Sequence, residues 1–190
     1  FAEYELWVAS ASSTCELVYE FISMFDISDG IDIPTGECIY AGIMTDTGSF
    51  RYPSTSKHVH LIIADLMDIG VIHSKIHQLI YDNNTEARLR LLGYALSEKM
   101  TVLEEYHTAY IALSKEELER FDAKGGDTEG FVNYALSLKG IVFAALIKED
   151  DKMIKMSFRS KGDFPANQFS KNHFNGGGHK NAAGGRSTLS

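Results

Sequence analysis

The sequence predicts an α/β protein whose first part is helical and whose second part contains a mixed sheet. From residue 56 to residue 97 the apolar residues recur at helical spacing, and breaks at Gly70 and Asn83-Asn84 indicate three helices. After Glu98 the spacing changes to the alternation of a half-buried strand. This change of period places a domain boundary between residues 98 and 99 and divides the chain into residues 1–98 and 99–190.

The first part is expected to begin with two helical segments. Ser12 or Ser13 caps a helix that continues through Phe25, because a short hydroxyl side chain accepts a hydrogen bond from the first free N–H groups. A second helix or buried segment covers residues 37–46, and a short extended stretch at residues 50–52 follows it. The apolar spacing of the first helix predicts a buried face made of Leu17, Val18, Phe21 and Ile22.

The second part reads as an α/β module. Alternation at Tyr106, Thr108, Tyr110 and Ala112 predicts its first strand, and Ser114 with Glu117 forms the pattern of a capping box. The elements that follow are a helix over residues 129–136, a hairpin over residues 141–158 and a short helix that Pro165 starts.

Composition bounds the class of partner. Apolar residues make up 44% of the 190 residues, which is enough for a core, and the formal net charge of −8 argues against a protein that grips long duplex nucleic acid. Short or mononucleotide substrates remain compatible with that charge. No apolar run approaches the length of a membrane span, so no membrane partner is expected. Cys15 and Cys38 form no disulfide framework, which favours a reducing, cytoplasmic location.

The stretch from Gly176 to Gly185, which reads GGGHKNAAGG, carries the strongest functional signal. Glycines let backbone N–H groups approach an anion without Cβ obstruction, and the small residues after His179 allow a helix to start or another backbone to come close. We therefore interpret the run as a phosphate cradle with an imidazole at its rim. The alternative is a flexible glycine-rich tail.

A second signal lies at Asp46, in the stretch MTDTGSF. An apolar segment there delivers a carboxylate into a turn, which is one way in which a scaffold presents an acid to a metal ion or a substrate. A turn residue or helix-terminal cap explains the same position equally well. His73 and His77 lie four residues apart on a predicted helix, but the sequence offers no third ligand, so surface or packing roles are favoured for both.

Together these stretches resemble the DHH phosphoesterase superfamily, in its oligoribonuclease and phosphoadenosine-phosphate phosphatase branch. The resemblance rests on TDTGSF, on SFRS at residues 157–160 and on GGGHKNAAG at residues 176–184. It implies the helical C-terminal part of a DHH catalytic domain followed by a smaller mixed-sheet, substrate-binding α/β domain. In that family Asp46 would be a catalytic metal ligand. The substrate-binding residues would be Arg159, Ser160, Gly176, Gly177, Gly178 and His179.

One departure from the family shapes these expectations. The Asp-His-His triplet that names the family is missing from the sequence, and Phe1 stands where no initiator methionine is found. The resemblance therefore implies the C-terminal part of an enzyme with two Mn²⁺ ions, whose remaining ligands lie upstream of Phe1. Alone, the 190 residues are expected to be inactive.

The resemblance implies a metal-dependent phosphoesterase that hydrolyses short oligoribonucleotides, 3'-phosphoadenosine 5'-phosphate, or both, to mononucleotides. Its partner would be a short RNA or nucleotide substrate, and the sequence leaves a homodimer open. Two alternatives remain at this point. One is a nucleotide- or phosphate-binding module without catalysis, and the other is a phosphoesterase of a related branch that acts on polyphosphate, single-stranded DNA or a cyclic dinucleotide.

Overall fold

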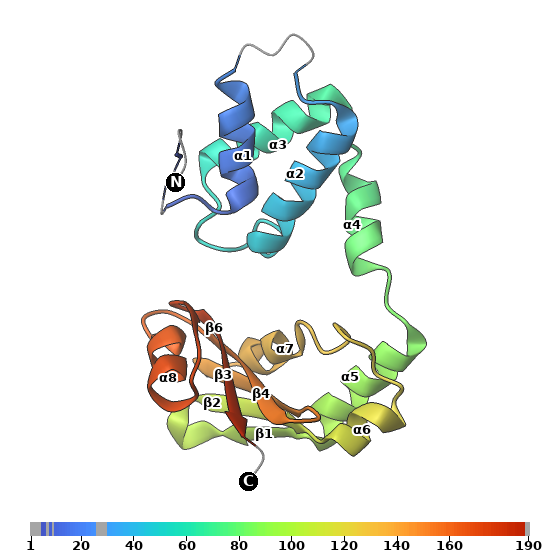
Figure 1. The fold of residues 1–190 in the computed structure, drawn as a ribbon, viewed down its shortest axis with the longest axis vertical. Helices are drawn as coiled ribbons and strands as arrows, with labels where there is room; N and C mark the ends of the chain where they lie inside the picture. Colours follow the sequence, from blue (N-terminus) through green and yellow to red (C-terminus); the bar gives the residue numbers. More distant parts are fainter. Residues whose placement is uncertain (1–4, 7, 9, 26–29, 189–190) are drawn as a thin grey trace. The chain divides into compact units, whose positions relative to one another are not determined.

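The computed structural model describes residues 5, 6, 8, 10–25 and 30–188, and Phe1 lies outside these residues. Contacts divide the chain into two units, residues 1–83 and residues 84–190 (Figure 1). The division falls earlier than the expected boundary between residues 98 and 99. The reason is that Leu91 and Ala95, in the helix before that boundary, are buried in the core of the second unit.

The described part of the first unit is helical. Its core lies between α2, α3 and α4, with α1 packed against it, and the most buried side chains include Ile43, Met44 and Leu66. A left-handed Gly70, at φ 113°, ends α3 as the sequence predicts. The helices are α1 (Thr14–Ser23), α2 (Ile33–Asp46), α3 (Lys57–Ile69) and α4 (His73–Tyr81).

Helix α1 begins as expected but turns a different face to the core. Ser13 is its cap, and its hydroxyl accepts a hydrogen bond from the N–H of Glu16 at 3.0 Å. The expected buried face is confirmed at Ile22 and wrong at Val18 and Phe21, which are exposed. Cys15 and Tyr19 pack against the core instead. The cause is Gly42 of α2, which leaves room for Cys15, since a Cβ at Gly42 would overlap the Cys15 sulfur.

Helix α2 is longer than the sequence indicates, because Asp32 caps it and Pro34 occupies its first turn. The side chain of Asp32 accepts a hydrogen bond from the N–H of Thr35 at 3.0 Å. The extended stretch expected at residues 50–52 is wrong. Ser49 and Phe50 both have positive φ, at 60° and 64°, so the chain turns tightly after the helix.

The second unit contains a six-stranded sheet in the order β1-β2-β3-β4-β6-β5, which confirms the predicted α/β class with a mixed sheet. Strands β2 and β3 are parallel and the other neighbours are antiparallel. The strands are β1 (Met100–Leu103), β2 (Thr108–Leu113), β3 (Phe143–Glu149), β4 (Met153–Ser160), β5 (Gly177–His179) and β6 (Ala182–Thr188).

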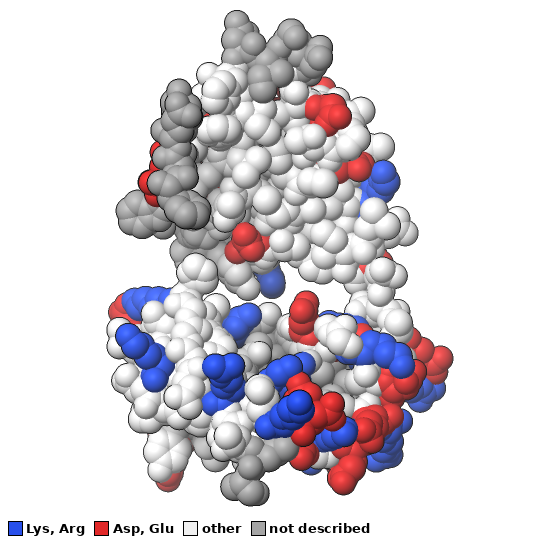
Figure 2. Space-filling view, in the orientation of Figure 1, with Lys and Arg blue, Asp and Glu red and all other residues white. Residues whose placement is uncertain are grey.

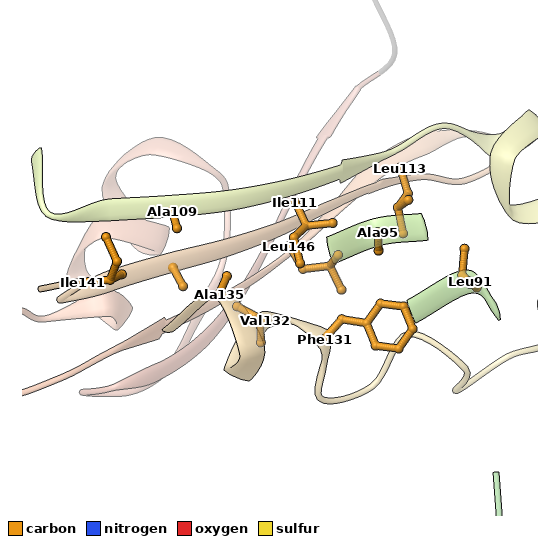
Figure 3. Packing of buried hydrophobic residues seen from close by; sticks show 11 residues of the cluster. Leu91, Ala95, Ala109, Ile111, Leu113, Phe131, Val132, Ala135, Ile141 and Leu146 are labelled. Atoms are coloured by element: carbon orange, nitrogen blue, oxygen red, sulfur yellow. The ribbon is translucent and has the colours of Figure 1, made fainter. Parts of the chain in front are cut away.

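Helices cover both faces of this sheet. On one face the side chains of β2 and β3 meet those of α5 and α7 in a buried cluster that includes Ile111, Leu146 and Phe131 (Figure 3). On the other face α8 packs against an aromatic cluster around Phe143 and Phe158. The helical segments are α5 (Glu86–Glu98), the 3₁₀ turn η1 (Glu104–Tyr106), α6 (Lys115–Arg120), α7 (Phe131–Ser137) and α8 (Ala166–His173).

Most elements of this unit match the sequence analysis, including the capping box, the hairpin and the short helix after Pro165. The expected first strand needs correction at two points. Tyr106 lies in η1 rather than in a strand, and the sequence analysis did not foresee β1. In β2 the fully buried residues Ala109 and Ile111 lie between the residues whose alternation predicted the strand, because both faces of the sheet are covered. In the described part of the chain, no helix is both long enough and apolar enough to cross a membrane.

Two helical glycines provide a paired test of the α1–α2 packing. Gly93 of α5 has open space around the position of a Cβ, whereas a Cβ at Gly42 meets the Cys15 sulfur. Gly93→Ala should stabilise its unit by about 0.5–1 kcal/mol through helix propensity. Gly42→Ala should destabilise its unit, because overpacking costs about 1–3 kcal/mol. Urea unfolding measures both changes. Cys15→Ala in the Gly42→Ala background should restore stability, and equal effects at the two glycines would contradict the packing described.

Glu117 predicts how the stability of the second unit depends on pH. Burial raises the pKa of this carboxylate, but hydrogen bonds from Lys99, Tyr94 and the Ser114 N–H outweigh burial and lower the pKa from 4.5 to about 2. A lowered folded-state pKa adds stability above the unfolded value, and this stability is lost as pH falls from 4.5 towards 2. Thermal unfolding across that range should show the loss. Glu117→Gln should remove it, whereas Glu119→Gln, on the exposed side of α6, should retain it.

Candidate functional site

The register of three strands places Arg159 and His179 side by side. Arg159 of β4 pairs with Ala182 of β6, and Ala182 pairs with His179 of β5. Residues directly opposite each other share a face of the sheet, with Cα atoms about 4.5–5.5 Å apart. Arg159, Ala182 and His179 therefore form one row, which we call the arginine row. Strand pairing thus brings Arg159 and His179, which are 20 positions apart in the sequence, onto the same row. A shared role in binding one substrate requires this proximity.

A second row on the same face is made of small residues. Ser157, Gly184 and Gly177 are paired across β4, β6 and β5 and form what we call the glycine row. Gly184 and Gly177 are exposed, and Ser157 is half-buried. On the β2–β3 half of the same face, the buried core covers Ala144 and Leu146 instead. The β4–β6–β5 half is thus an accessible floor of backbone with Arg159 and His179 along one side, and we call it the open face.

The three glycines of the run differ in their surroundings. A Cβ at Gly176 would overlap the Gly184 carbonyl oxygen and the Ser170 hydroxyl, so this glycine is needed for packing. Gly178 has φ 145°, and a Cβ there would lie 2.5 Å from the Ala182 carbonyl oxygen. Around Gly177 nothing lies within 4 Å of a Cβ position. Gly177 is therefore the glycine of the run whose missing side chain leaves space for a ligand.

The conformation of the run also corrects the sequence analysis. No helix follows the three glycines. Gly177 to His179 form strand β5, which turns back into β6 in an antiparallel hairpin. The other expectation, a close backbone approach, is confirmed by the contacts of Gly176 and Gly178 with β6. The candidate anion site is therefore the surface of the sheet near its edge strand β5. It is not a glycine-rich loop at the N-terminus of a helix.

Arg159 is half-buried on the open face. Its Nη1 donates to the carbonyl oxygen of its neighbour Phe158 at 2.9 Å, which fixes the side chain. A guanidinium has several further N–H donors in a planar fork, the geometry that matches a phosphate bidentately. His179 is exposed and adds an imidazole to the same row. The pair can bind one anionic group from two sides.

Ser160 lies on the opposite face of the sheet from Arg159, beside Phe143. It is 7% exposed, and its hydroxyl donates to the Phe164 carbonyl oxygen at 2.7 Å and accepts from Asn181 Nδ2 at 2.9 Å. Asn181 is the residue before β6, so these bonds hold the tip of the β5–β6 hairpin. The structure therefore gives Ser160 a role in positioning the hairpin and separates it from the arginine row.

Asp46 is the last residue of α2 in the first unit, and its side chain is exposed. The turn after it is fixed by Thr47, which is fully buried, donates its hydroxyl to the Ile43 carbonyl oxygen at 2.7 Å and accepts from the Phe50 N–H at 3.0 Å. Gly48 has φ 58° and faces the ring of Tyr52. The TDTG sequence thus encodes a rigid turn that holds one carboxylate at a helix end.

The electrostatic position of Asp46 is unfavourable. A carboxylate at a helix C-terminus lies at the negative end of the helix dipole, where a cation would be favoured. Desolvation raises the pKa of the Cys15 thiol, and the charge of Asp46 raises it further, so the carboxylate also acts on α1. Within the described residues the Asp46 carboxylate has no hydrogen-bonding or ion-pairing partner. A bound cation would relieve this unfavourable arrangement.

The described residues do not form a metal site by themselves. None of their His, Cys, Asp and Glu side chains gather in a group of three or more that could hold a metal ion. Asp46 is therefore a single candidate ligand, and two metal ions need more. His73 and His77 agree with the packing role favoured for them: Tyr40 and His77 form a hydrogen bond at 3.2 Å, and the two histidine rings are in contact.

Two features of the open face were missed in the sequence analysis. The sequence analysis quoted Ser157 and Gly184 only as parts of motifs and did not name them as candidate site residues. In the structure they form the glycine row together with Gly177. The basic residues Lys155 and Arg186, further along the same face, were not singled out. A signal was available on β4, where Lys155, Ser157 and Arg159 alternate with apolar residues and so must share a face.

Comparison with known proteins matches the second part of the chain to a domain family. The DHHA1 domain family matches residues 104–190, which include the arginine and glycine rows. The bifunctional oligoribonuclease and PAP phosphatase NrnA of Bacillus subtilis is 29% identical over 181 residues, covering 94% of this chain and 56% of that protein. NrnA of Thermus thermophilus is 27% identical over 175 residues, covering 92% of this chain and 51% of that protein.

A solved structure extends this likeness to the whole fold. The crystal structure of an exopolyphosphatase-related protein from Bacteroides fragilis superposes with a TM-score of 0.94 at 42% identity, and the match covers 100% of this chain and 55% of that one. The chain spans about half the length of the relatives that it matches. These likenesses confirm the resemblance to the DHH phosphoesterase superfamily, and residues 104–190 match the DHHA1 domain family.

Proposed function

We propose that this chain binds the substrate of a metal-dependent phosphoesterase that hydrolyses short oligoribonucleotides, 3'-phosphoadenosine 5'-phosphate, or both. The observation that carries the proposal is the arginine row, which sets Arg159 and His179 beside the exposed backbone of Gly177. The names of the Bacillus and Thermus relatives give the substrate class of those proteins. Their reaction is transferred to this chain as part of the proposal.

In the proposed complex a phosphate group lies over Gly177 and next to Arg159. The guanidinium donates two N–H groups to phosphate oxygens, and His179 donates to a phosphate or ribose oxygen from the other end of the row. Because these groups bind a phosphate and not the attacking water, they orient the substrate. Hydrolysis then breaks a P–O ester bond, with water oxygen joining phosphorus and the leaving oxygen taking a proton.

Activation of the water is the chemistry that two divalent ions, Mn²⁺ by our expectation, would supply. Asp46 is the residue of this chain proposed as one of their ligands, on the strength of its exposed carboxylate and its rigid turn. The described residues contain no group of side chains that could complete this metal site. The proposed substrate contacts therefore involve only Arg159, His179 and the backbone at Gly177. The cytoplasmic location expected from the sequence remains part of the proposal, and a homodimer stays open.

A second candidate function is a nucleotide-binding module without catalysis. The observation that favours it is that the described residues lack a group of three or more metal-ligating side chains. Hydrolysis assays separate the two functions: the 190-residue chain, incubated with Mn²⁺ and phosphoadenosine phosphate or a dinucleotide, is expected to show little turnover by itself. Rates on the order of 1 per second, ordinary for an enzyme, would show that the chain assembles its own metal site.

The arginine row predicts which substitutions weaken nucleotide binding. Arg159→Ala and His179→Ala should each lower the affinity for adenosine monophosphate about ten- to hundredfold, because a charge-assisted hydrogen bond contributes roughly 1.5–3 kcal/mol. Calorimetric titration measures the change. Gly177→Val should weaken binding while the fold persists, since open space surrounds this position. Gly176→Val is the contrasting variant and should disrupt the fold. Unchanged affinity in the first three variants would place the phosphate elsewhere.

Asp46 should behave differently from the arginine row. In a preparation that hydrolyses phosphoadenosine phosphate with Mn²⁺, Asp46→Asn should lower kcat by more than about 100-fold. Substituting a residue that only hydrogen-bonds to a metal ligand costs about 10- to 100-fold, and losing the ligand itself should cost more. The affinity for adenosine monophosphate should not change, because Asp46 belongs to the other unit. Asp68→Asn, an exposed carboxylate on α3, is the control. Activity within a few-fold of the original would reduce Asp46 to a turn residue.

A further inference from the structure

A second group of basic residues lies beyond the glycine row, on β4 and β6 of the open face and on the neighbouring strand β3. Lys148 of β3 pairs with Lys155 of β4, and Lys155 pairs with Arg186 of β6, so the three side chains lie in one row across three strands. We call it the basic row. Lys155 and Arg186 are exposed. Figure 2 shows Lys and Arg side chains over β4 and β6, with acidic side chains beside them.

The charges of this row repel one another, and the Asp150 carboxylate compensates part of that repulsion. Like charges directly opposite each other on neighbouring strands destabilise the pairing. Asp150 Oδ2 lies 2.5 Å from Lys155 Nζ, and Lys148 Nζ donates to the Thr128 hydroxyl at 3.1 Å. Arg186 has no side-chain partner within the described residues. The formal charge of the chain is −8, so a row of three cations contrasts with the rest of the composition.

The spacing of the rows indicates the kind of anion that fits. Arg159, Ser157 and Lys155 are successive residues on one face of β4, so the arginine row and the basic row lie about 13 Å apart, at roughly 3.3 Å per residue. The glycine row between them carries no charge. Phosphates that follow one another directly would place an anion over that uncharged row. In an oligonucleotide a sugar separates each phosphate from the next, so fewer anions lie over the uncharged row, and phosphates two nucleotides apart can contact the two charged rows.

We propose that the basic row is a second phosphate subsite, so that the open face binds an oligonucleotide strand that runs along β4 and β6. The arginine row holds one phosphate, the glycine row lets the sugar-phosphate backbone approach the sheet, and the basic row holds a phosphate further along the strand. Asp150 competes with that phosphate for Lys155. This proposal rests on the proposed function and adds to it a preference for oligonucleotides over mononucleotides.

Binding as a function of strand length tests the subsite. Adenosine monophosphate and the di-, tri- and tetranucleotides of adenosine are titrated into the chain, and affinity should rise with length. Lys155→Ala with Arg186→Ala should lower the affinity for the tetranucleotide roughly tenfold and leave that for adenosine monophosphate unchanged, since exposed charge pairs are each worth up to about fivefold. The dependence of affinity on salt should become weaker as the phosphate contact is lost.

Two further variants sharpen the test. Asp150→Asn should raise the affinity for the tetranucleotide about two- to fivefold, because it removes the competing carboxylate. Lys171→Ala is the control, since it removes an exposed cation from α8, which covers the other face of the sheet. The proposal is overturned if Lys171→Ala weakens tetranucleotide binding as much as the double variant does. It is also overturned if a short polyphosphate binds as tightly as the tetranucleotide and depends equally on Lys155 and Arg186.

The same titrations separate this proposal from the proposed function. If the chain binds adenosine monophosphate and Arg159→Ala removes that binding, the arginine row is supported. A double variant that then binds the tetranucleotide as tightly as the original chain overturns the second subsite alone. If the original chain binds no nucleotide of any length, the proposed function fails, and the inference fails with it.

Discussion

The close packing of α8 against the β5–β6 hairpin is the constraint on which the candidate site depends. Ser170 of α8 is fully buried and donates its hydroxyl to the Gly184 carbonyl oxygen at 2.6 Å. That bond requires two strands without side chains in its path, and Gly176 and Gly185 both have Cβ positions that would overlap or crowd Ser170. Because the helix covers one side of the hairpin this tightly, the arginine and glycine rows of the other side are left for a ligand.

Local signals in the sequence predicted most of the fold, because they act within one turn of helix or one pair of strands. Ser13, Gly70 and the Ser114–Glu117 box were recognised from neighbouring residues alone, and each forms the cap expected of it. The choice of buried face on α1 depends instead on Gly42, a residue of another helix. Strand β1 escaped notice because it is short, and half of its residues are exposed.

The candidate site was predicted as a set of residues but not as a surface. The family resemblance named Arg159, Ser160 and the three glycines together as substrate-binding residues. Strand pairing separates two of these residues, because neighbours in a strand point to opposite faces of the sheet. Arg159 lies on the open face, whereas Ser160 lies on the other face and its hydroxyl bonds to Phe164 and Asn181 hold the β5–β6 hairpin. The pairing of β6 with β4 and β5 shows that Arg186 and the accessible Gly177 share the face of Arg159, whereas the alternation along β4 already places Lys155 there.

The aromatic cluster beneath β4 has a consequence for how relatives of this chain can differ in length. Phe158 is 2% exposed, and its ring packs with those of Phe143 and Phe169, while its neighbour Arg159 faces the other way. An inserted or deleted residue that shifted the strand by one position would drive the guanidinium into that cluster and the phenyl ring into solvent. Length variation must therefore be absorbed in the turn at residues 150–152, so evolution can lengthen this hairpin at its tip while the strand keeps its alternation.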